Sequence, residues 1–113
     1  MRIKRGSFCR FYKDLYWGNS VKNRALVKWK LKMGSGQFGI YCVTRAMGMG
    51  GQLDIINSAF LKQKYYRYNP VLVYGIAEGY EEAVELVLRI SQEASIAGLD
   101  GKLAEFLENK DKK

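Results

Sequence analysis

Histidine is absent from the 113-residue sequence, and this absence restricts the chemistry that the protein can perform. Histidine is the commonest general base and metal ligand, and it activates the nucleophile in Ser–His and Cys–His systems. Without it, catalysis would rest on Asp, Glu, Lys, Tyr or an isolated Cys, and no nucleophile–base pair or set of metal ligands is visible. We therefore predict no catalytic residues, no metal site and no cofactor, and a small histidine-free enzyme ranks behind two non-catalytic interpretations.

Cysteines and long apolar runs are also scarce. Cys9 and Cys42 are far apart and lack the C-x-x-C spacing of zinc sites and thioredoxin-like motifs. We interpret both as reduced thiols, with Cys42 in the core. The alternative, in an oxidising compartment, is a disulfide between the two cysteines. No apolar run reaches 18 residues, and the N-terminal segment MRIKRGSFCRFYK lacks the apolar stretch of a signal peptide. The sequence therefore predicts a cytoplasmic protein with no membrane partner.

The residues that are present have the composition of a small globular domain. Hydrophobic residues make up 48% of the chain and aromatic residues 13%. A chain of this length and composition can build a core without disulfides or a structural metal. We expect one α+β domain over residues 1–113, with a frayed C-terminal tail at 110–113.

The glycine-rich segment GSGQFG, residues 34–39, matches the fingerprint of a dinucleotide-binding turn. That turn requires a helix after its glycines, because the pyrophosphate binds at the helix N-terminus. Residues 38–43 instead alternate between the two faces of a strand. We therefore reject the nucleotide site in favour of a turn that leads into a strand.

The stretch before these glycines also alternates, which predicts a β-hairpin over residues 26–45. In the register that buries the most apolar surface, one face carries Trp29, Leu31, Phe38, Ile40 and Cys42. The other face carries three lysines that we expect to be exposed: Lys28, Lys30 and Lys32.

The remaining patterns complete the predicted fold. Residues 52–77 indicate a strand–helix–strand crossover, whose second strand, VLVYGIA, is apolar enough to be buried on both faces. The helical periodicity of residues 80–97 is the clearest in the chain, and Glu78, Glu81 and Glu82 are most simply residues that favour its start. A short helix over 101–109 follows. The whole predicts an α+β fold with a mostly antiparallel sheet and two C-terminal helices packed on it.

Charge is distributed unevenly along the chain. Residues 1–69 hold 14 of the 19 Lys and Arg residues but only two of the 11 acids, a net charge of +12. Residues 70–113 hold five basic and nine acidic residues, a net charge of −4. This asymmetry favours an anionic partner for the first part of the chain.

The candidate binding residues combine cations with an aromatic ring, as in proteins that hold single-stranded nucleic acid. They are Arg5, Arg10, Lys28, Lys30, Lys32 and Tyr41. The partner is single-stranded nucleic acid or an acidic protein. The alternative is an ordinary solvated strand surface, since lysines also keep strands from pairing.

A homodimer is the other non-catalytic interpretation. Leu86, Leu88 and Ile96 lie outside the main apolar stripe of the predicted helix 80–97. Exposed apolar residues of this kind mark interfaces, which predicts a structural or interaction module that works by homo-oligomerisation.

Overall fold

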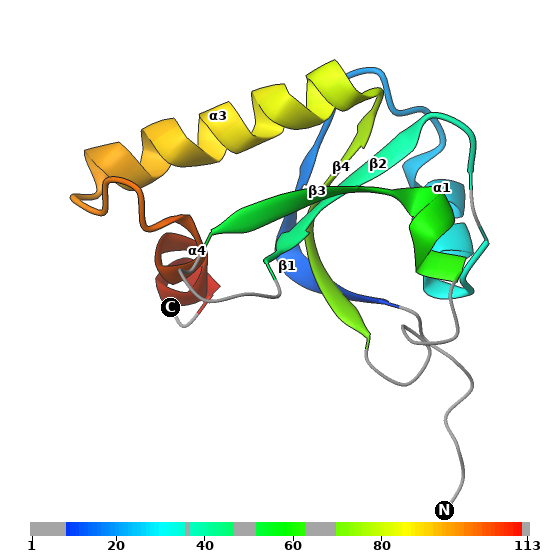
Figure 1. The fold of residues 1–113 in the computed structure, drawn as a ribbon, viewed down its shortest axis with the longest axis horizontal. Helices are drawn as coiled ribbons and strands as arrows, with labels where there is room; N and C mark the ends of the chain where they lie inside the picture. The colour runs from blue at the N-terminus through cyan, green and yellow to red at the C-terminus, as the bar shows by residue number, and fades with distance from the viewer. Residues whose placement is uncertain (1–8, 36, 47–51, 63–69, 112–113) are drawn as a thin grey trace, which may run out of the picture.

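Four strands form one mixed sheet with helices on both faces in the computed structural model, which describes residues 9–35, 37–46, 52–62 and 70–111 (Figure 1). In chain order, the elements are β1 (Cys9–Trp17), α1 (Arg24–Lys32), β2 (Ile40–Arg45), β3 (Leu53–Asn57), the 3₁₀ helix η1 (Ser58–Lys62), β4 (Val71–Glu78), α3 (Tyr80–Ile96) and α4 (Leu103–Asp111). The fold class is therefore α+β, as predicted.

The strand order is β1-β4-β2-β3, and the sheet is mixed rather than mostly antiparallel. β4 pairs in parallel with β1 and antiparallel with β2, and β2 pairs antiparallel with β3. The expectation of a mostly antiparallel sheet was wrong because the N-terminal strand joins the far side of β4 instead of extending a hairpin. β4 is apolar along most of its length, and the centre of the sheet is where such a strand is best buried.

The predicted hairpin over residues 26–45 was wrong, because its first half is helix α1. The Asn23 side chain accepts a hydrogen bond from the Leu26 N–H (3.4 Å) at the helix start. Val27 and Leu31 are buried one helical turn apart. Their spacing of four residues satisfies a strand and a helix equally well, so alternation alone did not distinguish the two.

This change of element alters which aromatic side chains are buried. Leu31, Ile40 and Cys42 are in the core as predicted. Trp29, expected in the core, has 58% of its surface exposed, and Phe38 is fully exposed. The hairpin register that would have buried both rings does not exist.

The glycine-rich segment joins the end of α1 to the start of β2. Gly34 and Gly39 both have φ of 79°, a left-handed conformation that glycine adopts without strain. The strand β2 follows Gly39. A dinucleotide fingerprint would have a helix at this place, so the observed order agrees with its rejection.

Two hydrophobic clusters lie on opposite faces of the sheet, and β4 contributes to both. Val73 and Ile76 pack with α1 on one face, whereas Tyr74 and Ala77 pack with α3 and α4 on the other. These two faces are called here the α1 side and the α3–α4 side. The prediction that β4 is buried on both faces is confirmed.

The two C-terminal helices pack on the sheet as predicted. Gly79 forms the N-cap of α3, and Gly98 follows its last turn with φ of 83°. Leu86 is fully buried, which contradicts its predicted place outside the apolar stripe. Leu88 and Ile96 are exposed.

The predicted crossover 52–77 is described only in part. β3 and β4 run in the same direction, but β2 lies between them. η1 occupies residues 58–62 of the predicted helix, and residues 63–69 lie outside the described part of the chain. No helix within the described ranges is long and apolar enough to cross a membrane.

Candidate functional site

The structure brings some of the predicted binding residues together and separates others. Lys28, Lys30 and Lys32 all lie on α1. Arg10 lies on β1 and Tyr41 on β2. Arg5 lies outside the described residues.

The cations of α1 are arranged around its buried stripe. Arg24, Lys28 and Lys32 are four residues apart and therefore share one flank of the helix, while Lys30 lies on the opposite flank. The first flank faces the edge strand β1. There the guanidinium of Arg24 lies 5.1 Å from the ring centroid of Trp17. The ammonium of Lys28 lies 5.2 Å from that of Phe11.

These four cations are not neutralised by the described part of the protein. α1 contains no acidic residue. Both ion pairs among the described residues, Arg45–Glu108 and Lys110–Glu93, involve α3 or α4. The positive charge of α1 is therefore available to an external anion, and exposed cation–π contacts of about 0.5–1 kcal/mol do not remove it.

Three exposed apolar side chains run along the outer surface of α1, and sequence reasoning missed them. They are Leu26, Trp29 and Met33, spaced by three and four residues. They point away from the buried stripe of the helix, which Val27 and Leu31 form. The signal that could have revealed this surface is a tryptophan between lysines in the segment KWK.

Tyr41 does not share the lysine surface, so the prediction that it lies on the same face as the lysines was wrong. It is half-buried on the α3–α4 side, and its ring meets that of Tyr80 edge to face with centroids 5.9 Å apart. The prediction assumed that the lysines lay on the strand paired with β2. Because they lie on a helix that covers the other face, the sheet separates them from Tyr41.

Arg10 is exposed, but it does not extend the cationic surface of α1. Its neighbours Cys9 and Phe11 both belong to the α1 side. Successive side chains of a strand point to opposite faces, so Arg10 is directed to the α3–α4 side.

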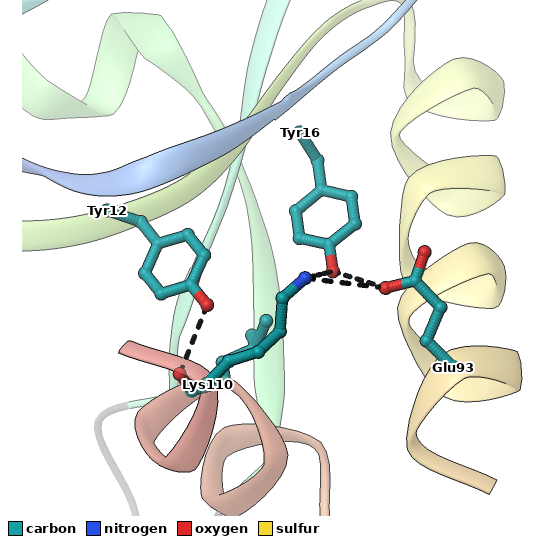
Figure 2. A network of polar contacts seen from close by, with 5 residues as sticks. Tyr12, Tyr16, Glu93 and Lys110 are labelled. Atoms are coloured by element: carbon teal, nitrogen blue, oxygen red, sulfur yellow. Dashed lines mark hydrogen bonds and ion pairs between the residues drawn. The ribbon is translucent and has the colours of Figure 1, made fainter. Parts of the chain in front are cut away.

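A second polar cluster, which sequence reasoning missed, connects β1 to both C-terminal helices (Figure 2). Lys110 Nζ donates to the hydroxyl of Tyr16 (3.0 Å), which in turn donates to Glu93 Oε1 (2.6 Å). Nearby, the Tyr12 hydroxyl donates to the backbone carbonyl of Leu107 (3.1 Å). No periodic pattern links residues that are 77 to 95 positions apart.

The chemistry of this cluster favours a structural role. Burial and the hydrogen bond to Glu93 raise the pKa of Tyr16 well above its ordinary value. A tyrosine in this state stays protonated at neutral pH and is a poor general base. The cluster therefore joins the layers of the fold through a chain of charge-assisted hydrogen bonds.

The glutamates near the start of α3 include one with a defined structural contact. Glu82 accepts hydrogen bonds from the backbone N–H groups of Ser20 (3.0 Å) and Glu78 (2.8 Å). Slight burial raises its pKa, but these hydrogen bonds lower it more, so the net shift is downward. Glu82 is thus an ionised carboxylate that ties the loop after β1 to the end of β4.

Both cysteines are buried free thiols on the α1 side. Burial raises the pKa of Cys9 to about 12 and raises that of Cys42 further. Because the thiolate is the nucleophile, neither thiol is activated at neutral pH. Within the described residues, no three His, Cys, Asp or Glu residues are grouped so that they could hold a metal ion.

Comparisons of the chain with protein-family models, curated proteins and solved structures found no match.

Proposed function

We propose that the protein binds single-stranded nucleic acid through the outer surface of α1. Arg24, Lys28, Lys30 and Lys32 contact phosphates, and a base stacks on Trp29. The observation that carries the proposal is the 58% exposure of Trp29 in the middle of a helix with four cations and no acid. Cations beside an exposed aromatic ring are the combination by which proteins hold single strands.

The size of the surface sets the expected strength of binding. A nine-residue helix is about 13 Å long, so α1 alone contacts only a few nucleotides. Electrostatic attraction dominates the affinity, and four phosphate contacts should give a log–log slope against salt of about −3. We expect weak binding with little sequence preference, since stacking accepts every base.

The salt dependence of binding to a labelled random single strand tests the role of the lysines. The log–log slope is near −0.7 per phosphate contact for single strands, so replacing Lys28, Lys30 and Lys32 by Gln should make it shallower by about two units. The matched control replaces two exposed cations of the α3–α4 side, Arg89 and Lys102, by Gln and should leave the slope unchanged. Failure of the wild type to bind at low salt would end the proposal.

The stacking contact has a separate signature. Trp29→Ala should weaken binding by about 1–3 kcal/mol with little change of slope, because it removes a ring and no charge. Phe38→Ala is the control, since Phe38 is an even more accessible ring that lies outside α1. Equal losses in the two variants would contradict stacking at Trp29.

An acidic protein is the second candidate partner, because Leu26 and Met33 flank Trp29 and extend the apolar surface. An amphipathic helix of the partner, with acidic residues along its margins, would cover this exposed apolar surface and pair with the lysines on either side of it. Binding of this kind would lose affinity in both Leu26→Ser and Met33→Ser, whereas stacking of a base on Trp29 would leave those variants near wild type.

A further inference from the structure

The two edges of the sheet differ in how well they resist pairing with another strand. β1 has a register shift between Phe11 and Tyr16, and the charged residues Lys13 and Asp14 lie within this irregular stretch. Bulges and charges are the usual means by which an edge strand avoids pairing. β1 is therefore a protected edge.

β3, at the other edge, carries few of these protections. Its register with β2 is regular from Leu53 to Asn57, its sequence LDIIN contains no proline, and Asp54 is its single charged residue. Leu53 and Ile55 are only partly buried. Among the described residues, no strand pairs with the outer edge of β3.

The two flanks of helix α3 differ in the same way as the two sheet edges: the flank toward β1 is charged, and the flank toward β3 is not. On the flank toward β1 it carries Glu82, Arg89 and Glu93, and two of these make contacts there: Glu93 with Tyr16 and Glu82 with Ser20. This side of the helix is charged and already engaged with the rest of the fold.

The opposite flank of α3 contains no charged residue. It is formed by Tyr80, Val84, Val87 and Ser91, which follow one another at spacings of four, three and four residues. This flank lies toward β3, because Tyr80 meets Tyr41 and the backbone of Tyr41 pairs with Asn57 of β3. An apolar helix flank and a regular strand edge thus adjoin on one side of the molecule.

We propose that a second copy of this chain binds at this side, with β3 pairing antiparallel to β3 of the partner around a two-fold axis at Ile55. A C₂ contact of this kind uses the same patch on both subunits and closes on itself. The eight strands would form one continuous sheet, and the uncharged flanks of the two α3 helices would face each other above it.

The sequence of β3 suits pairing with itself. A two-fold axis at Ile55 sets Asp54 opposite Ile56 of the partner subunit and Leu53 opposite Asn57 of the partner subunit. No like charges are therefore directly opposed, which would otherwise destabilise the pair. The axis is perpendicular to the sheet, so both copies of α1 remain uncovered on the other face. The proposal is independent of nucleic-acid binding.

Molar mass by light scattering tests the dimer directly. We expect the mass to rise from 12.9 kDa toward twice that value as the concentration increases into the high micromolar range. Val84→Arg should raise the dissociation constant at least tenfold by placing like charges across the axis. Ser91→Arg serves as a second variant of the same flank, because Ser91 is only half-buried and its replacement leaves the core intact.

The matched control is Ile96→Arg, on the same helix but 88% exposed and away from this flank. It should leave the dissociation constant unchanged. Hydrogen exchange adds a test of the strand pairing, since the outer amides of residues 53–57 should become protected only as the dimer forms. A monomer at every concentration, equal weakening by Ile96→Arg, or a dimer without this protection would overturn the proposal.

Discussion

On the α3–α4 side of the sheet, charged side chains form ion pairs and hydrogen bonds with side chains of other elements, whereas among the described residues the cations of α1 form none. Tyr16, Glu93 and Lys110 connect a strand to two helices, and Arg45 pairs with Glu108. The cations of α1 have no ion-pair partner in the described part of the chain. Charged side chains thus stabilise the fold on the α3–α4 side, and the cations of α1 remain available to a partner.

The core of the α3–α4 side should respond most strongly to substitution. Leu86 is fully buried, so Leu86→Ala should lower the free energy of unfolding by about 2–5 kcal/mol through lost burial and a cavity. The exposed Ile96, on the same helix, provides the control, and Ile96→Ala should change stability by less than about 0.5 kcal/mol. Chemical denaturation measures both, and comparable losses would contradict the described packing of α3.

The close approach of α3 to β4 gives the next largest effect. A Cβ on Gly75 would lie 3.1 Å from a Leu86 methyl carbon and 3.2 Å from the backbone oxygen of Tyr16. Gly75→Ala should therefore cost about 1–3 kcal/mol by overpacking. In the Leu86→Ala background the added methyl group gains space, so the double variant should lose less than the sum of the two single losses. Strict additivity would show that the two side chains do not meet.

The polar cluster should contribute less than the apolar core. Tyr16→Phe removes two hydrogen bonds, but Glu93 and Lys110 are partly exposed and still lie 3.7 Å apart, so the expected loss is about 0.5–1.5 kcal/mol at neutral pH.

The pH dependence of stability gives this cluster a signature of its own. The pKa of Tyr16 is raised in the folded state, so its contribution is complete below the ordinary tyrosine pKa of about 10 and is lost as pH rises toward the folded value. The wild type should therefore lose stability more steeply above pH 10 than Tyr16→Phe. Parallel curves from pH 8 to 11 would contradict the raised pKa.

The smallest effect on stability should come from α1. Lys28→Gln removes a cation that lies over Phe11 at the surface, and we expect a change within about 0.5 kcal/mol in the unliganded protein. A loss as large as that of Leu86→Ala would mean that α1 uses its charge to hold the fold, and the contrast between the two sides would disappear.

The sequence predicted those parts of the fold in which the spacing of apolar residues fits only one type of secondary structure. In α3, Ala83, Ile90 and Ala94 recur at helical spacing and in no other. β4 is a short, continuous apolar run between Pro70 and Gly79, which is too short for a typical buried helix. In both segments the local sequence pattern is enough to predict the secondary structure.

The parts that were wrong or missed depend on tertiary contacts. The lysine segment of α1 fits a strand and a helix equally well, and the packing of Val27 and Leu31 on the sheet decides between them. The pairing of Tyr16 with Glu93 depends on how distant segments meet. Of the candidate site, the sequence indicated the lysines, but it misplaced Tyr41 and assigned Trp29 to the core.

The fluorescence of Trp29 during titration with a random-sequence single strand tests the central claim most directly. In a Trp17→Phe background Trp29 is the only indole, because the chain has two tryptophans. We predict saturable quenching at low salt that reverses when salt is added. In a Trp29→Phe control we expect a smaller response of Trp17, because Trp17 lies beneath Arg24 and does not stack on a base. A strand that binds while the emission of Trp29 stays unchanged would place the site elsewhere and contradict the assignment of α1 as the binding surface.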